Sequence, residues 1–209
     1  MKKMKKGLFT LILLCANFLC AQKIIKKSII NPGVSLIQIE ADNCFEVDVA
    51  TSNTNEMVVE AVMDGEYKKN LLVNVKEEGT TVLVRPGFQP NFIKPNDKLS
   101  AHKIVSIALT IKVPQYLNLQ IYGVSCNVTA SGRYETLKVT LADGSCVLNN
   151  VGETVDIITQ SGDIYVSSPF AEIKAWTKYG KIYRETIPGG NNLFTLNTTT
   201  GNIHLKKTE

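Results

Sequence analysis

The sequence predicts an all-β protein, and three observations support this prediction. Apolar and polar residues alternate in runs rich in Val, Ile, Thr and Leu, as in strands that bury one face. No stretch of ten or more residues has the i, i+3, i+4 apolar spacing of an amphipathic helix. A glycine-containing pattern returns about every twenty residues in the second half, which is typical of a β-solenoid. We therefore predict a single-domain β-solenoid, a parallel β-helix with right-handed connections, preceded by N-terminal β-strands and a Pro-rich loop.

The first segment, residues 1–21, is predicted to be a secretory signal peptide. It begins with four lysines, continues through a short apolar run and ends at a small-residue cleavage point, Ala21. Lipid attachment at Cys15 or Cys20 is the alternative, although Leu stands before each, where a lipobox has a small residue. We expect an exported protein, in the periplasm or on the cell surface, that is not an integral membrane protein once the signal is removed.

The charge balance argues against nucleic acid as a partner. The chain has 23 Lys and Arg against 19 Asp and Glu, but four of the lysines belong to the leader. Without the leader the formal net charge is zero, so counterion release from phosphates would give little driving force. Three cysteines remain, Cys44, Cys126 and Cys146. An odd number leaves at least one thiol unpaired in an oxidising compartment.

Residues 22–116 are expected to form the N-terminal strand region. Within it, "KEEGTTV" is typical of a hairpin turn. The long loop 86–103 contains three prolines, which interrupt any strand ladder. It is interpreted as a surface connection or as a binding loop, and the apolar side chains of Phe88 and Phe92 favour binding. The predicted strands lie in "SLIQIEADNCFEVDVA", "MVVEAVM", "LLVNVKEEGTTVLVRP" and "IVSIALTIKVP".

Residues 117–209 form an internal repeat of coils 18–21 residues long. Parallel strands of successive coils would stack about 4.8 Å apart, and alternate side chains would point inward. An inward residue therefore lies above its equivalent in the next coil. One inward column is expected to hold Leu119, Val139, Ile157, Ala175 and Leu196, and a second to hold Cys126, Cys146, Ile164, Ile182 and Ile203.

The second of these columns begins with two cysteines. Cys126 and Cys146 are interpreted as buried apolar residues, and a disulfide between adjacent coils is the alternative. A catalytic thiol is not expected, because no histidine lies near either residue in sequence. A glycine precedes the column by two residues in four coils, and we predict structural turns there because glycine takes a positive φ at low cost. These glycines are Gly144, Gly162, Gly180 and Gly201.

The outward residues next to the second column are candidates for ligand binding. Tyr165, Tyr183 and His204 should present rings on one outer face, and Trp176 lies on another outward column with Ile158. Regularly spaced rings can stack on sugars or accept a flat protein surface. The alternative is that these residues only favour strands and cover their neighbours.

No sequence motif indicates catalysis or a resident cofactor. The Asp residues at the turns do not reproduce the Gly-Gly-x-Gly-x-Asp pattern of calcium-binding β-solenoids. Metal ligation is weakly supported, because C-x-x-C is absent and the two histidines, His102 and His204, lie far apart. Serine-hydrolase, zincin and phosphate-loop motifs are absent as well. We therefore expect neither an enzyme, nor a metal site, nor a cofactor.

The tandem "LADGSCVL", "TQSGDIYV" and "TTTGNIHL" resemble the putative-adhesin β-helix domains of exported bacterial proteins. The resemblance covers roughly residues 30–207 and implies a non-catalytic binding module, with a glycan or a cell-surface protein as partner. An envelope scaffold that pairs through the ends of the solenoid is the alternative, although the charges of the last segment, "HLKKTE", are expected to guard its edge. A polysaccharide-active enzyme is the remote alternative, on fold analogy alone.

Overall fold

The computed structural model describes residues 22–65, 67–92 and 105–209. The predicted signal peptide 1–21 and residues 93–103 of the predicted loop 86–103 lie outside the described residues. The loop prediction is wrong for residues 86–88, which end a paired strand. Among the described residues every element is a strand except one short 3-10 turn, Lys68–Asn70, so the all-β prediction is confirmed. None of the described helices is long and apolar enough to cross a membrane.

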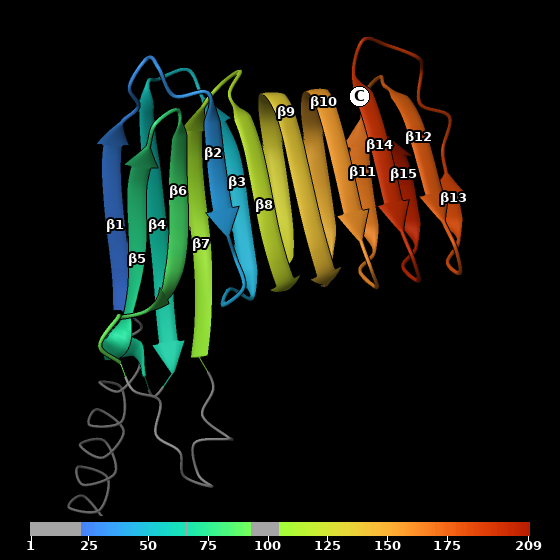
Figure 1. The fold of residues 1–209 in the computed structure, drawn as a ribbon. Coiled ribbons are helices and arrows are strands. Elements are labelled where there is room, and N and C mark those ends of the chain that lie inside the picture. The colour runs from blue at the N-terminus through green and yellow to red at the C-terminus, as the bar shows by residue number, and fades with distance from the viewer. Residues whose placement is uncertain (1–21, 66, 93–104) are drawn as a thin grey trace, which may run out of the picture.

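Fifteen strands form one sheet that does not close on itself. It folds over into two facing rows, because the long strands β9 and β10 bend and take part in both (Figure 1). The strands are β1 (Gln22–Ile29), β2 (Leu36–Glu40), β3 (Glu46–Ser52), β4 (Glu56–Gly65), β5 (Leu71–Glu78), β6 (Thr81–Phe88), β7 (Val105–Pro114), β8 (Asn118–Ser125), β9 (Asn127–Asp143), β10 (Cys146–Thr159), β11 (Ile164–Ser168), β12 (Glu172–Thr177), β13 (Ile182–Arg184), β14 (Leu193–Thr198) and β15 (Ile203–Lys207).

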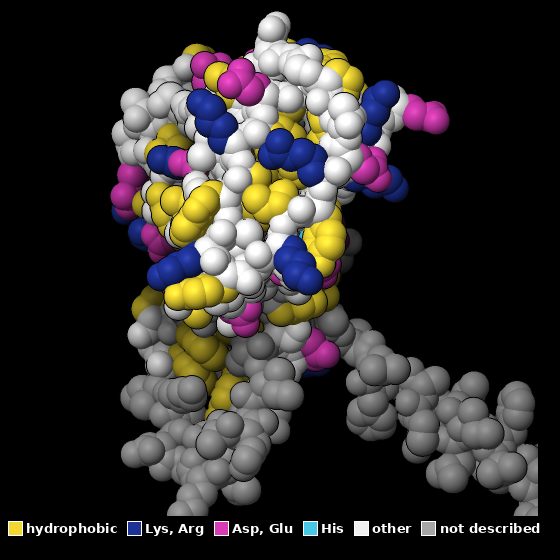
Figure 2. All heavy atoms as spheres, turned by 90° about the vertical axis from the view of Figure 1, so that its right-hand side faces the viewer, with side chains coloured by type: hydrophobic (Ala, Val, Ile, Leu, Met, Phe, Trp, Pro, Cys, Tyr) yellow, Lys and Arg dark blue, Asp and Glu magenta, His cyan; other side chains and the backbone are white. Residues whose placement is uncertain are grey.

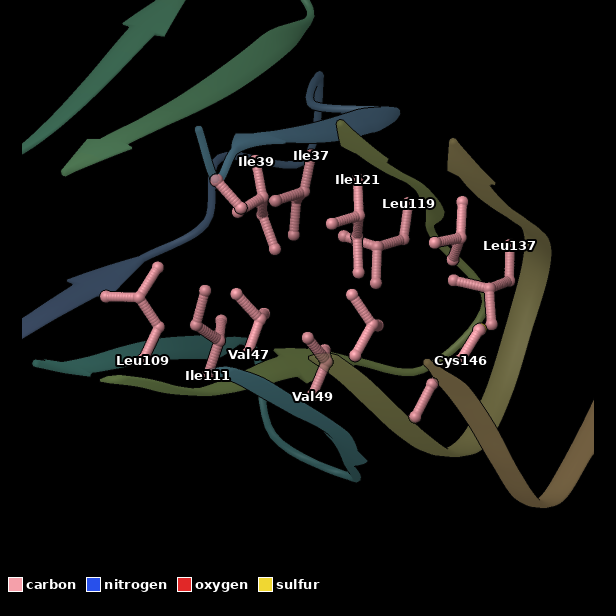
Figure 3. Close-up of a cluster of buried hydrophobic side chains, with 14 of the residues drawn as sticks. Ile37, Ile39, Val47, Val49, Leu109, Ile111, Leu119, Ile121, Leu137 and Cys146 are labelled. Carbon is pink, nitrogen blue, oxygen red and sulfur yellow. The ribbon is translucent and has the colours of Figure 1, made fainter. Parts of the chain in front are cut away.

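The core lies between the two rows. Alternate residues of each strand are buried, as the period-two pattern of the sequence predicts. Figure 3 shows side chains from opposite rows pointing toward one another, for example Ile37 and Ile39 of β2 above Val47 and Val49 of β3. These four residues are at most 3% exposed, so the inward columns form one continuous apolar core.

Strand pairing is mixed, which corrects the expectation of a parallel β-helix preceded by separate strands. β1, β4 and β7 pair antiparallel, and β5 and β6 form the predicted hairpin, with Gly79 at φ 63° in its turn. Parallel pairing already begins with β2 and β3, which stack on β8 and β9. Strand β1 was not among the predicted strands; its sequence, QKIIKKSI, alternates poorly.

The last three coils do not stack in chain order. β14 pairs with β10 on one side and β12 on the other, and β15 lies likewise between β11 and β13. The final coil is therefore inserted beneath the one that precedes it in sequence, and residues 185–192 cross over to allow this (Figure 1). At this end of the sheet the outermost strands are β12 and β13, and β15 lies inside them, so the prediction that "HLKKTE" guards the edge is wrong.

The predicted columns are correct from the second coil onward but shifted by two residues in the first. Val139, Ile157, Leu196 and Ala175 are register partners in that spatial order. Ile121, rather than Leu119, lies opposite Val139. In the second column Val128, rather than Cys126, lies opposite Cys146, and the order continues through Ile164, Ile203 and Ile182.

The recurring glycines lie in the predicted connections, but the predicted reason for them is wrong in three of four cases. Only Gly144 has a positive φ, 98°. A Cβ on Gly162 would lie 1.5 Å from the Gly144 carbonyl oxygen, and one on Gly201 would lie 2.1 Å from that of Gly162. Gly180 meets the Gly201 oxygen in the same way, and Gly144 meets that of Cys126. Close backbone approach between stacked coils therefore requires glycine here.

A threonine three residues before the glycine completes this corner in the last three coils. Thr159 donates from Oγ1 to the Gly162 carbonyl oxygen at 2.7 Å. Thr198 donates to the same oxygen at 3.3 Å and accepts the Gly201 N–H at 3.1 Å. The Thr-x-x-Gly spacing is visible in the sequence as TQSG, TKYG and TTTG. Buried Thr hydroxyls thus satisfy backbone groups that the corner leaves without a strand partner.

We expect Thr198→Val to cost about 1–3 kcal/mol in the free energy of unfolding, because it leaves buried polar groups without their partner. Thr198 is 1% exposed, and valine keeps its shape while removing the hydroxyl. Urea denaturation measures the change. The control is Thr195→Val, on the exposed side of the same strand, which should change stability by less than about 0.5 kcal/mol. Equal stabilities of the two variants would contradict the role given to the Thr198 hydroxyl.

Candidate functional site

The predicted outer rings lie in a continuous row on β11, β15 and β13. Tyr165 and Tyr183 are both register partners of His204, so the imidazole lies between the two phenols. Each tyrosine ring stacks on the imidazole with centroids 4.7 Å apart, at interplanar angles of 11° and 15°. The spacing between parallel strands sets this separation. We call Tyr165, His204 and Tyr183 the aromatic row.

The aromatic row exposes its ring edges more than its faces. Stacking covers the ring faces within the row, whereas Tyr165 is 39% exposed and Tyr183, at the outer end, is 50% exposed. The Tyr165 hydroxyl donates to Asp163 Oδ2 at 3.3 Å. Burial, followed by the Asp163 charge, raises the pKa of Tyr165, so the phenol stays protonated. A planar ligand could therefore stack only at the Tyr183 end of the row.

A groove of about 410 Å³ adjoins the Tyr183 end of the aromatic row. Both charge signs line it, and Glu185 Oε2 accepts the Lys207 N–H at 3.0 Å. Sequence reasoning missed the charged residues here; their positions just after the predicted aromatics were the available signal. The groove is lined by Tyr183, Arg184, Glu185, His204, Leu205 and Lys206.

The other predicted binding residues lie apart from the aromatic row. Trp176 is 54% exposed on β12, in the opposite row of strands, and Asn197 lies between it and Ile158. Phe88 and Phe92 stack on each other at 4.6 Å and pack edge-on against Tyr67. That cluster belongs to the β5–β6 end of the sheet, away from β13 (Figure 1). The structure therefore does not join these residues into one site.

The three cysteines among the described residues are free and buried. This confirms the interpretation of Cys126 and Cys146 as buried apolar residues, and the alternative, a disulfide between them, is not formed. Burial raises the pKa of Cys146 to about 12, and burial with the Glu46 charge raises that of Cys126 to about 12. The pKa of Cys44 is raised as well, mainly by burial. These thiols therefore stay protonated at neutral pH and are poor nucleophiles.

No group of three or more His, Cys, Asp or Glu side chains that could hold a metal ion occurs within residues 22–65, 67–92 and 105–209. Asp143 and Asp163 instead accept hydrogen bonds in the turns. Asp143 Oδ1 accepts the Gly144 N–H at 2.8 Å, and Asp163 Oδ1 accepts the Asn202 N–H. Asp143 Oδ1 also accepts the Ser161 hydroxyl at 3.0 Å, so both carboxylates join adjacent coils through turn hydrogen bonds.

No family model matches the chain, and the search of curated proteins finds no match. Comparison with solved structures finds a similar fold. A crystal structure of a putative cell adhesion protein from Clostridium sporogenes matches 90% of this chain and 100% of its own, with a TM-score of 0.59 and 16% identity. That of a putative adhesin from Bacteroides fragilis matches 88% and 97%, with a TM-score of 0.41 and 12% identity. The first likeness shows a shared fold.

Proposed function

We propose that the chain is an exported, non-catalytic binding module of the adhesin type, whose stacked coils form a β-solenoid. The predicted leader supports export, and the fold shared with a putative cell adhesion protein supports a surface role. The observation that carries the proposal is the exposed aromatic row Tyr165–His204–Tyr183 with its charged groove. Rings held in place by strands bind at low entropic cost, because they are ordered before the ligand arrives.

The ligand class follows from the shape of the row. Tyr183 offers a ring face at the end of the stack, and Arg184, Glu185 and Lys206 offer hydrogen-bonding groups beside it. A sugar ring of a surface glycan needs both an apolar platform and such polar partners. A cell-surface protein is the other ligand class, because the edges of the three rings form an apolar strip flanked by charge.

We expect the double variant Tyr165→Ala/Tyr183→Ala to lose at least about tenfold in affinity, since it removes both outer rings and leaves only His204. A screen of the wild type against a glycan array and against immobilised cell-surface proteins first identifies a ligand; surface plasmon resonance then compares the variants. The matched control is Tyr122→Ala, because Tyr122 is also 39% exposed but lies on β8. Unchanged affinity of the double variant would exclude the aromatic row as the binding surface.

Assembly through the β12–β13 end is a second candidate, favoured by incomplete burial there. Ile182 is 39% exposed, although its register partner Ile203 is fully buried. Figure 2, which faces this end, shows hydrophobic side chains among Lys and Arg side chains. Basic side chains at this end, which we call the basic guard, take the role predicted for "HLKKTE". Their like charges would oppose the pairing of two such ends. This guard comprises Lys174, Lys178, Lys181 and Arg184.

Sedimentation velocity tests the second candidate. Replacing three of the four guard residues, with Lys174→Ser, Lys181→Ser and Arg184→Ser, lowers the repulsion between ends, so we expect the triple variant to associate at concentrations where the wild type is monomeric. A wild type that already sediments as dimers or larger species would favour assembly as the native function. A single monomeric species for both proteins at the highest soluble concentration would exclude association through this end.

A further inference from the structure

Among the residues that the structure describes, three other than glycine have a left-handed backbone, and all lie at the corner opposite the recurring glycines. Tyr116, Asn150 and Glu153 have φ values of 60°, 50° and 73°. Asn150 lies within one, and Glu153 borders the other, of the two register shifts where β10 bends from one row of strands to the other. Such a conformation costs of order 1–3 kcal/mol per residue, and it recurs at functional sites because surrounding structure must hold it. This corner is therefore a place to look for a ligand.

A groove of about 400 Å³ opens at this corner, within the size range of small-molecule sites. The crossover 185–192 closes one side and fixes Asn192, whose Oδ1 accepts the Glu153 N–H at 3.0 Å and whose Nδ2 donates to the Phe170 carbonyl at 3.2 Å. On the other side Arg133 donates from Nη1 to the Tyr116 hydroxyl at 3.1 Å. The polar groups that line the groove are thus held in fixed orientations without a ligand. The residues used below are Arg133, Asn150, Gly152, Glu153, Phe170 and Asn192, which we call the corner groove.

The chemistry of the corner groove selects the kind of ligand. Arg133 supplies donors, Glu153 supplies acceptors, and Asn150 supplies an amide that can do both. Phe170, 47% exposed, adds an apolar ring at the edge. One cation and one anion line the groove, so it offers no net charge to an ionic ligand. Sugar hydroxyls donate and accept at once, and the C–H face of a pyranose packs on an aromatic ring.

An extended peptide fits this corner less well. Peptides commonly add a strand to an open sheet edge, where backbone hydrogen bonds give affinity. After the bend β10 has no open edge, because it pairs with β9 on one side and β14 on the other. We propose that the corner groove binds a neutral saccharide, as a second site separate from the aromatic row. The inference does not depend on the function proposed for that row.

The test uses the signal-free chain and three probes: maltotriose, cellotriose and mannotriose. Each is titrated to 20 mM while amide resonances are followed by NMR, and we expect at least one to shift residues of the corner groove with a dissociation constant in the range of about 0.1–10 mM. Gly152→Leu fills the groove and should weaken binding at least tenfold. Gly33→Leu is the matched control, because no heavy atom lies within 4 Å of a Cβ at Gly33, its φ is not positive, and it lies outside the corner groove.

Arg133→Met tests the same site without adding volume and should also weaken binding at least tenfold, whether or not Gly152→Leu folds. Tyr165→Ala/Tyr183→Ala should bind the saccharide as the wild type does, which separates this site from the aromatic row. Three outcomes would overturn the proposal: no probe shifts the corner-groove resonances, Arg133→Met binds as tightly as the wild type, or the peptide Gly-Ser-Gly-Ser-Gly causes shifts there that no saccharide causes.

Discussion

Gly162→Ala is expected to destabilise the protein by about 3 kcal/mol or more, at the upper end of the range for overpacking. The added methyl would lie 1.5 Å from the Gly144 carbonyl oxygen and 2.7 Å from its carbon, and both atoms belong to the backbone of the neighbouring coil. A flexible side chain could move aside, but here two stacked coils must separate. For a domain of this size we expect the melting temperature to fall by about 6–12 °C, measured by circular dichroism.

Gly189→Ala is the matched control for this prediction. No heavy atom lies within 4 Å of a Cβ at Gly189, and its φ is not positive. The melting temperature of Gly189→Ala should stay within about 2 °C of that of the wild type, since surface substitutions usually change stability by less than about 0.5 kcal/mol. If Gly162→Ala melted together with this control, close packing between the coils would not explain the glycine repeat.

Phe194→Ala is expected to lower the free energy of unfolding by about 3–5 kcal/mol, as for other buried phenylalanines. Phe194 is 2% exposed on β14, and its register partners are Val155 of β10 and Ile173 of β12. The cavity would lie beneath the outermost coil, which β14 and β15 hold in place. Hydrogen exchange should therefore show faster exchange in residues 172–184 than the global loss of stability explains.

Leu193→Ala, one position earlier on the same strand, is the control. Its side chain is 50% exposed, so its removal should cost less than about 0.5 kcal/mol and leave exchange in residues 172–184 unchanged. Uniform loss of protection across all strands in Phe194→Ala would show that the inserted coil does not support the outermost coil separately from the rest.

The sequence predicts the local geometry of the coils better than their spatial order. Side-chain alternation gives the inward residues, and the repeat pairs Val139 with Ile157 and Cys146 with Ile164, because both depend on neighbours in sequence. The first coil was misaligned because Cys126 was assigned to the apolar column, whereas it occupies the glycine position. The insertion of β14 and β15 beneath β12 and β13 depends on a crossover that leaves no periodic signal.

The two candidate sites also differ in how far the sequence predicts them. The aromatic row follows from spacing alone, since Tyr165, Tyr183 and His204 occupy equivalent positions, although His204 lies between the tyrosines because of the insertion. The corner groove could not be predicted, because its residues come from separate coils and from the crossover. Of its two left-handed residues, Asn150 is of a type that often takes this conformation, whereas Glu153 gives no signal in a single sequence.

The crossover 185–192 has a consequence for how the chain matures. Residues 172–184 leave the ribosome before residues 193–207, yet the later segment is the platform on which the earlier one rests. Until residues 193–207 are made, β12 and β13 therefore lack their native pairing partners, β14 and β15. A product cut short after residue 192 would lack the strands that pair with β10 and β11 at this end, and we expect it to be a substrate for proteolysis.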